Sequence, residues 1–140
     1  MPGSPVERTL VLIKPDAVRR GLVGEIISRF ERKGLRIDAM VLREMDPALA
    51  DEHYAEHVDK DFYPPLKAFM TGGPLVAMVL SGDQAIEVVR GMTGATDGRK
   101  ADAGTIRGDL SLSNRENLLH ASDSVESAKR ELILWFPDLG

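Results

Sequence analysis

The sequence has no cysteine, which excludes disulfide bonds, thiolate metal sites and a cysteine nucleophile. Aromatic residues are scarce, at 5% of the 140 residues, with a single tryptophan. No apolar run approaches the roughly 18–20 residues that a membrane-spanning helix needs. The first residues carry neither a basic cluster nor a hydrophobic stretch. We therefore expect no signal peptide, a flexible tail over residues 1–6, a cytoplasmic protein and no association with a membrane.

A strong charge of one sign is also lacking. Lys and Arg number 18 against 22 Asp and Glu, for a formal net charge of −4. A dedicated nucleic-acid-binding protein needs a basic surface, so no nucleic-acid partner is expected. A small anionic ligand stays compatible, because it needs only a few local cations. The Gly-rich patterns G-x-x-x-x-G-K-[ST] and G-x-G-x-x-G are absent, so side chains would have to hold any phosphate groups.

What is present predicts a single domain over residues 7–140. The length and the 43% of hydrophobic residues are those of an ordinary globular domain. Strand patterns cover residues 9–13, 35–41, 75–80 and 118–119, and helical periods cover residues 23–33, 47–57, 64–70, 84–92 and 125–135. Two β-α-β halves of this kind predict a compact α+β sandwich with helices packed on the sheet. The polar loop 94–104 is longer than a simple connection needs, which is typical of functional loops.

Capping residues predict where several helices begin. Asp46 before Pro47 is an N-cap followed by proline at the first helical position. Asp83 is predicted to cap the helix that follows the third strand. Asp123 and Glu126 are spaced as a variant of the capping box, which predicts the start of the last helix.

Two of the three histidines form a motif with a specific chemistry. His53, Glu56 and His57 match H-x-x-E-H, the inverted signature of zinc peptidases. Two imidazoles four residues apart on a helix could bind Zn²⁺, with the glutamate as general base. The alternative is that two surface histidines fall four apart on an amphipathic helix by chance, and three fixed positions are easily met by chance.

His120 occupies a different position. It ends the apolar run Leu118–Leu119 and directly precedes the start of a helix. Anions collect at such a place, and a neutral imidazole there is a good nucleophile toward phosphorus. A histidine that merely satisfies hydrogen bonds near a helix cap would give the same pattern.

Other candidate residues are ordinary when taken one at a time. Lys14 ends the first strand, and Pro15 would aim it at a fixed point above the edge of the sheet. Lysines at strand ends are usually just solvated. Tyr54 and Phe62 could stack on a nucleobase, although packing is the commoner role of an aromatic side chain.

Three motifs in sequence order change this interpretation. They are Lys14-Pro15-Asp16, the run Gly104-Thr105-Ile106-Arg107-Gly108-Asp109, and the run Asn117-Leu118-Leu119-His120-Ala121-Ser122-Asp123-Ser124. Glu126, Glu131 and Leu134-Trp135-Phe136-Pro137 follow them. Over residues 7–137, nearly the whole chain, this sequence resembles the nucleoside diphosphate kinase family. The N-x-x-H-x-S-D-S element is highly specific.

The resemblance implies an enzyme that moves the γ-phosphate of ATP, or of another nucleoside triphosphate, to nucleoside diphosphates by a ping-pong route. It implies a phosphohistidine on His120, with Glu131 bonded to the far ring nitrogen and Ser122 supporting Glu131. It places Phe62 under the base, with Leu66 nearby. The groups that hold phosphates and ribose would be Lys14, Tyr54, Arg90, Thr96, Arg107 and Asn117.

The resemblance also implies a ferredoxin-like fold with a four-stranded antiparallel sheet. Mg²⁺ would arrive with the nucleotide and bridge its phosphates, without a metal site made by the protein alone. A homohexamer is implied, although a homotetramer is the other assembly in the family, and the 94–104 loop would build the trimer contacts. A kinase-fold protein that serves only as a regulatory module is the alternative to the enzyme.

Four positions near the implied site depart from the family pattern. Ala121 stands beside the histidine where Gly is usual, and Asp61 precedes Phe62 where Pro is common. Gly98 and Ala103 stand where the loop usually has prolines. Since proline lowers the entropy of the unfolded chain, their replacement predicts a softer loop.

Overall fold

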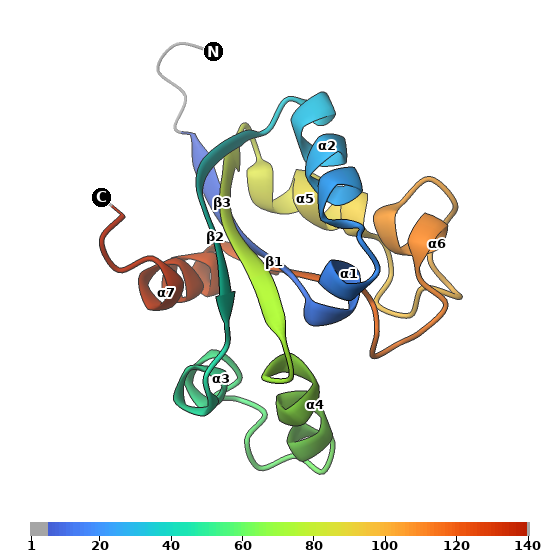
Figure 1. The fold of residues 1–140 in the computed structure, drawn as a ribbon. Helices are drawn as coiled ribbons and strands as arrows, with labels where there is room; N and C mark the ends of the chain where they lie inside the picture. The colour runs from blue at the N-terminus through green and yellow to red at the C-terminus, as the bar shows by residue number, and fades with distance from the viewer. Residues whose placement is uncertain (1–5, 140) are drawn as a thin grey trace.

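The computed structural model describes residues 6–139, and its strands form one antiparallel sheet (Figure 1). The strands are β1 (Glu7–Ile13), β2 (Arg36–Glu44), β3 (Pro74–Gly82) and β4 (Leu119–Ala121), in the spatial order β2-β3-β1-β4. Every neighbouring pair is antiparallel. The ferredoxin-like α+β fold is thereby confirmed. The predicted tail lies outside the described residues except for Val6, which is exposed.

Helices cover both faces of the sheet (Figure 1). On one face lie α1 (Pro15–Arg19), α2 (Val23–Lys33), α5 (Ala85–Thr93) and α6 (Ile106–Leu110). On the other face lie α3 (Pro47–His53), α4 (Tyr63–Met70) and α7 (Val125–Trp135). None of the helices in residues 6–139 is both long and apolar enough to cross a bilayer.

The central strand β1 contributes side chains to both hydrophobic cores. Val11 and Ile13 are fully buried in the cluster beneath α2 and α5, whereas Leu10 and Leu12 are fully buried in the cluster beneath α3, α4 and α7. This follows from the two-residue period of a strand, whose successive side chains point to opposite faces. Because β1 is held from both sides, the residues at its end and those of its neighbour β4 have fixed positions.

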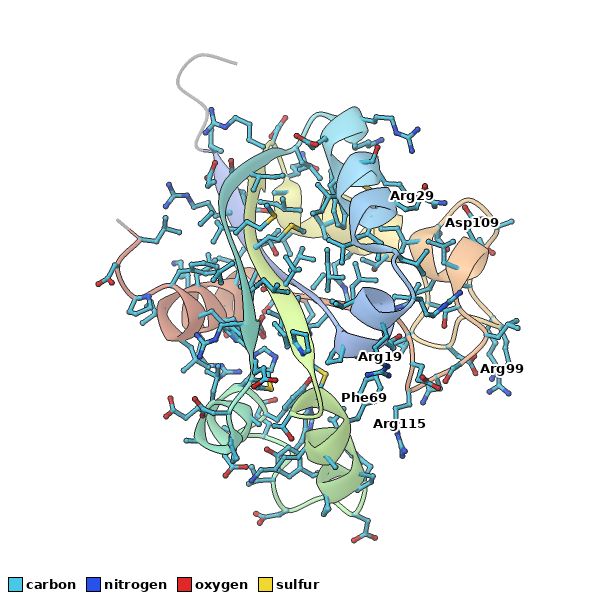
Figure 2. The ribbon with its side chains drawn as sticks, in the orientation of Figure 1. Arg19, Arg29, Phe69, Arg99, Asp109 and Arg115 are labelled. Atoms are coloured by element: carbon cyan, nitrogen blue, oxygen red, sulfur yellow. The ribbon has the colours of Figure 1, made fainter. Side chains whose placement is uncertain are left out.

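Two short helices, α1 and α6, were not predicted. Each has five residues, too few to show a helical period in the sequence. Thr105 caps α6 by accepting a hydrogen bond from the Gly108 backbone N–H at 3.0 Å. The Arg29 guanidinium on α2 donates to the Asp109 carboxylate at 2.9 Å, which ties α6 to the body of the domain (Figure 2). The segment that carries Arg107 is therefore anchored at both ends.

Helix α3 ends earlier than predicted. Its start is as expected, because the Asp46 side chain accepts a hydrogen bond from the first turn. It stops at His53, however, and turns carry the chain through His57. The Arg130 guanidinium on α7 donates to the carbonyls of Glu52 and His53 at 3.0 and 2.9 Å. The carbonyls at the end of α3 thus accept hydrogen bonds from a donor outside the helix. Because the helix stops at His53, His53 and His57 do not lie on one helical face.

The cap predicted for α5 is wrong. Gln84, with φ +53°, occupies the N-cap position in place of Asp83, and its side chain makes no capping bond. The orphan N–H of Ile86 in the first turn donates instead to the Glu7 carboxylate of β1, at 2.9 Å. A residue distant in sequence thus performs the capping, which a local pattern does not reveal.

The capping box predicted for α7 is also wrong. Ser124 is the N-cap, and its hydroxyl accepts a hydrogen bond from the Ser127 backbone N–H at 3.0 Å. Serine and aspartate are about equally good caps, so a sequence with Asp123 and Ser124 side by side leaves the start open by one residue.

At Gly98, where the sequence predicts a softer loop, the structure shows close packing. This residue is buried, and its N–H donates to the Ser113 carbonyl at 3.2 Å. A Cβ at position 98 would collide with the Ser111 backbone carbonyl. Close packing against the segment 111–113 therefore fixes the loop here, and proline would remove a donor that the fold uses.

Candidate active site

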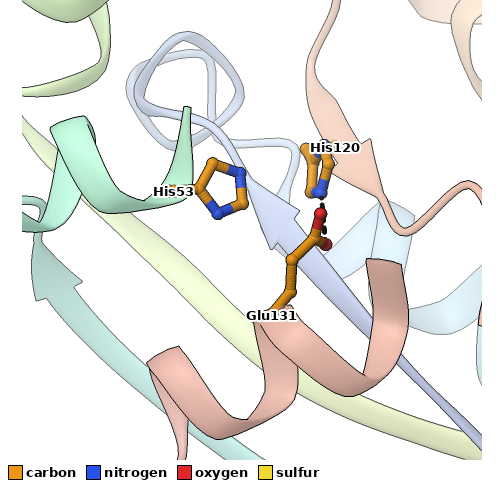
Figure 3. A group of neighbouring side chains, drawn as sticks. All are labelled: His53, His120 and Glu131. Carbon is orange, nitrogen blue, oxygen red and sulfur yellow. Dashed lines mark hydrogen bonds and ion pairs between the residues drawn. The ribbon is translucent and has the colours of Figure 1, made fainter. Parts of the chain in front are cut away.

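His120 lies at the middle of β4. Glu131 on α7 bonds to its ring, and Ser122 bonds in turn to Glu131. The Nε2 of His120 is 2.8 Å from Glu131 Oε1 (Figure 3). The Ser122 hydroxyl donates to that same oxygen at 2.8 Å. Strand alternation buries Leu119 and Ala121 in the opposite core cluster, so His120 faces α7. The imidazole therefore has one orientation.

The protonation of this group follows from its partners. Burial alone would raise the pKa of Glu131, but the hydrogen bond to His120, with the bond from Ser122, holds it below its ordinary value. An ionised carboxylate only accepts hydrogen bonds, so the proton of a neutral His120 imidazole resides on Nε2. The free lone pair is then on Nδ1, the ring nitrogen that faces away from Glu131 (Figure 3).

Lys14 is a buried cation behind the histidine. It lies at the end of β1, and its Nζ donates to Asn117 Oδ1 at 2.8 Å. Burial, together with the positive charge of Arg107, lowers the pKa of Lys14 from 10.5 to about 8. An ammonium group with so little water around it gains much from a phosphate oxygen, because charges interact more strongly at low dielectric constant.

Arg107 fixes the backbone around the nucleophile. Its guanidinium donates to three carbonyls, those of Asn117 at 3.0 Å, Gly94 at 3.1 Å and Leu119 at 2.6 Å. Burial, with the positive charge of Arg90, lowers the pKa of Arg107 to about 10. One side chain on α6 thus joins the 94–104 loop to the strand that carries His120.

Arg90, which lies on α5, is the third cation near His120. Its guanidinium donates to the Ala121 carbonyl at 3.3 Å, next to His120. The Ala121 methyl, which replaces the usual glycine, is buried with the core cluster on the opposite face of β4.

A cavity of about 240 Å³ opens beside the histidine. It brings together four of the predicted residues, Tyr54, Arg90, His120 and Glu131. Ser122, Lys14, Asn117 and Arg107 are buried around it. The full lining is His53, Tyr54, Glu56, His57, Arg90, His120, Ala121, Asp123, Ser127, Arg130 and Glu131.

A series of ring contacts leads from the nucleophile to the surface. The ring centroids of His120 and His53 are 4.8 Å apart, those of His53 and Tyr54 4.7 Å, those of Tyr54 and His57 6.4 Å, and those of His57 and Phe62 5.4 Å. Phe62 is 49% exposed at the N-cap of α4. The series ends in an aromatic face open to solvent.

The remaining predicted residues lie outside the cavity lining. Leu66 is half-buried on α4 and packs against the second core cluster. Thr96 is exposed on the 94–104 loop. The structure therefore groups most of the phosphate and ribose candidates near the cavity. Phe62, Leu66 and Thr96 lie outside its lining.

His53 is a buried neighbour of the nucleophile, so its interpretation as a surface histidine is wrong. Its Nδ1 accepts a hydrogen bond from Trp135 Nε1 at 3.0 Å. Burial, with the charge of His120, lowers the pKa of His53 to about 3 and keeps it neutral. The spacing of His53 from the apolar Leu49 and Ala50, at i+4 and i+3, places it on the buried helical face and could have revealed this.

The zinc-peptidase interpretation is not favoured. Within residues 6–139, the histidine and acidic side chains that converge are His53, His120 and Glu131, within 4.8 Å of one another, and neither Glu56 nor His57 joins them. Because Trp135 donates to Nδ1 of His53, the neutral ring carries its proton on Nε2. That nitrogen has no lone pair for a metal, and the group is better explained as ordered neighbours of His120.

Comparisons with known proteins identify the family of this chain. A family described as nucleoside diphosphate kinase matches residues 7–139. The chain is 70% identical to a nucleoside diphosphate kinase of Nocardioides over 94% of this chain and 98% of the relative, and 59% identical to that of Thermobifida fusca over 96% and 99%.

Solved structures agree as well. The structure of the Halobacterium salinarum nucleoside diphosphate kinase in complex with CDP has a TM-score of 0.93 at 46% identity, covering 96% of this chain and 90% of that one. The Aquifex aeolicus enzyme has a TM-score of 0.90 at 41% identity, with 94% and 96% covered. Because the family matches nearly the full length and the relatives agree in sequence and fold, this chain belongs to the nucleoside diphosphate kinase family.

Proposed function

We propose that this member of the family transfers the γ-phosphate of a nucleoside triphosphate to a nucleoside diphosphate through a phosphohistidine on His120. The observation that carries the assignment is the fixed imidazole, whose Nε2 is bonded to Glu131 and whose Nδ1 remains free beside a cavity lined with cations. A kinase-fold regulatory module is not favoured, because the nucleophile and both of its partners are intact.

The reaction has two symmetrical halves. Nδ1 of His120 attacks the γ-phosphorus, the bond from that phosphorus to the β–γ bridging oxygen breaks, and the diphosphate leaves with the bond's electron pair. The imidazole becomes positively charged on phosphorylation, and the Glu131 carboxylate stabilises that charge through Nε2–H. A terminal oxygen of the incoming diphosphate then attacks the phosphorus of the phosphohistidine. The bond from phosphorus to Nδ1 breaks, and its electron pair returns to Nδ1 and restores the neutral ring.

The cations position the phosphates. Lys14, Arg90 and Arg107 bring positive charge from β1, α5 and α6 toward the same strand. Phosphoryl transfer needs positioning and charge stabilisation more than covalent chemistry, so this set fits the task. We assign Tyr54, Thr96 and Asn117 to the sugar and phosphate groups with them.

The base is assigned to the exposed end of the ring series. Phe62 offers a free aromatic face, and Leu66 lies one turn further along α4. Stacking does not distinguish bases, since every base has a π-face, which is consistent with a single site for all nucleoside diphosphates.

Mg²⁺ is expected to arrive with the nucleotide. It takes oxygen ligands, keeps several waters and neutralises charge that develops on the β- and γ-phosphates. The carboxylates lining the cavity fit this, since Glu131 is committed to His120 while Glu56 and Asp123 remain to contact a hydrated ion.

A homohexamer is the assembly we propose, with a homotetramer as the alternative, in a cytoplasmic protein whose single domain spans residues 7–140. One supporting feature is β2, an edge strand whose Met40 and Leu42 are 53% and 64% exposed. Apolar edge strands are prone to pair with another chain. Light scattering over a dilution series separates the two assemblies by mass.

The test of the nucleophile is labelling with γ-³²P-ATP and Mg²⁺. The wild-type protein should acquire a label that is labile in acid and stable in alkali, and should pass it to GDP. His120→Ala should acquire none, whereas Lys129→Ala, at an exposed position on α7 outside the cavity lining, should be labelled like the wild type. Labelling of the His120→Ala protein would refute the assignment.

A further inference from the structure

Leu118, two residues before the nucleophile, has a strained backbone. Its φ is +77°, in a region that residues other than glycine rarely adopt. The Leu119 N–H donates to the Asn117 carbonyl at 2.9 Å, so Leu118 is the central residue of a γ-turn of the strained, positive-φ kind. The Leu118 side chain is fully buried in a core cluster.

Asp16 bonds directly to this turn. Its Oδ2 accepts a hydrogen bond from the Leu118 N–H at 3.1 Å, across 102 residues of sequence. On the other side, the Leu118 carbonyl accepts from the Lys14 N–H at 2.8 Å. Both backbone polar groups of the strained residue are thus held, one by Lys14 between β1 and α1 and the other by Asp16 in the first turn of α1.

Apart from its bond to Leu118, the Asp16 carboxylate acts on its described surroundings through its charge, which favours the protonated forms of Lys14 and Arg107. It is 1% exposed, and its second oxygen, Oδ1, is buried without a hydrogen-bond partner. Burial raises the pKa of Asp16, although the Leu118 bond opposes that shift. A buried carboxylate this poorly satisfied destabilises the fold on its own account, and the hydrogen bond that its side chain accepts comes from the strained turn. Asp16→Asn removes the charge and keeps an acceptor, so it separates the contribution of the charge from that of the hydrogen bond.

The turn at Leu118 sets the positions of Asn117, of His120 and of two backbone carbonyls that Arg107 binds. It reverses the chain between Asn117, which binds Lys14, and the start of β4, which carries His120. It also directs the Asn117 and Leu119 carbonyls to Arg107. If the turn opened, the ladder from Leu119 to β1 would lose its register at the residue next to the nucleophile.

We propose that Asp16 is a positioning residue that holds Leu118 in its left-handed γ-turn and so fixes His120 and Asn117 for transfer. Asp16 acts through the backbone of Leu118 and does not contact the nucleotide. The proposal depends on the assignment of His120 made above.

The test is the rate of His120 phosphorylation by ATP in a single turnover at pH 7, on variants shown by circular dichroism to be folded. Asp16→Ala removes the acceptor and should slow phosphorylation about tenfold, the equivalent of the strain in one left-handed residue. Asp16→Asn keeps an acceptor for the Leu118 N–H and should stay within about threefold of wild type. An Asn variant as slow as the Ala variant would overturn the proposal.

Two variants of Leu118, each combined with Asp16→Ala, separate the proposed effect of Asp16 on the turn from a general loss of packing. Leu118→Gly and Leu118→Ala both remove the buried side chain, but only glycine adopts a positive φ without strain. Asp16→Ala should slow phosphorylation about tenfold in the Leu118→Ala background and at most about twofold in the Leu118→Gly background. Equal effects in both backgrounds would overturn the proposal.

Folding gives a readout that does not depend on catalysis. The loss of unfolding stability caused by Asp16→Ala should also be smaller in the Leu118→Gly background. If Asp16→Ala alone does not fold, the double variant Asp16→Ala with Leu118→Gly should fold. If that double variant fails to fold while Leu118→Gly alone folds, the proposal is overturned. Labelling of His120→Ala would refute the nucleophile instead, whatever these stability measurements show.

Discussion

The two ends of the proposed site, a transfer end and a base end, are built differently. The transfer end, made of Lys14, Arg107, Asn117, His120 and Glu131, consists of side chains that are buried or nearly so and joined by hydrogen bonds of 2.6–3.0 Å. The base end, made of Phe62 and Leu66, offers an aromatic ring and an aliphatic chain at the start of α4, and Phe62 is half exposed.

The difference follows from what each end has to recognise. A transferred phosphate must meet Nδ1 of His120 in one geometry, and only groups locked by several partners provide such preorganisation. A base of variable shape needs only a flat apolar surface. Substitutions at the transfer end should therefore affect the rate strongly, whereas substitutions at the base end should affect binding mildly.

The largest effect is expected from Glu131→Gln. The amide keeps an acceptor for Nε2 of His120 but loses the charge that stabilises the phosphorylated ring. A hydrogen bond to a charged group contributes about 1.5–3 kcal/mol, so kcat should fall about 10- to 100-fold. Steady-state kinetics with ATP and GDP measure it.

Glu126→Gln is the matched control, since Glu126 is exposed in the first turn of the same helix. It should leave kcat unchanged. An equal loss in both variants would mean that the charge of α7 as a whole matters, and that the Glu131–His120 bond has no special part.

The sequence alone predicted the sheet and most helices, because strand and helix periods are local. It did not predict the links that run between distant segments. Asp16 with Leu118, Glu7 with Ile86 and Arg130 with the end of α3 join residues 77 to 102 positions apart. No local pattern encodes such pairs.

The candidate site shows the same division. Its residue types could be named from the motifs, whereas their burial and protonation required the packed structure. His53 is the main example, because its neutrality comes from burial against Trp135 and His120.

A smaller effect should appear in the pH dependence of the transfer end. Burial and the charge of Arg107, partly offset by Asp16, lower the pKa of Lys14 to about 8. Above that pH the free enzyme loses a cation that holds phosphate, so kcat/KM should fall about tenfold per pH unit on the alkaline side. The measurement is kcat/KM for ATP from pH 6.5 to about 9.5.

Lys14→Arg tests the source of this alkaline limb. Arginine stays protonated throughout the range, so its kcat/KM should be lower than that of wild type but flat with pH. Lys129→Arg, an exposed lysine on α7, should keep the wild-type profile. A falling limb that persists in the Lys14→Arg protein would assign the titration to another group.

The smallest effect is expected at the base end, from Phe62→Ala. Stacking on an aromatic side chain contributes roughly 1–3 kcal/mol per base, and the 49% exposure of Phe62 favours the low end of that range. KM for ADP, GDP, CDP and UDP should therefore rise about fivefold for each, with kcat little changed, because the transfer end stays intact. Val58→Ala, at 40% exposure in the same segment, should change neither value. A large loss for one nucleotide alone would mean that Phe62 contacts the edge of that base and does not serve as a common platform.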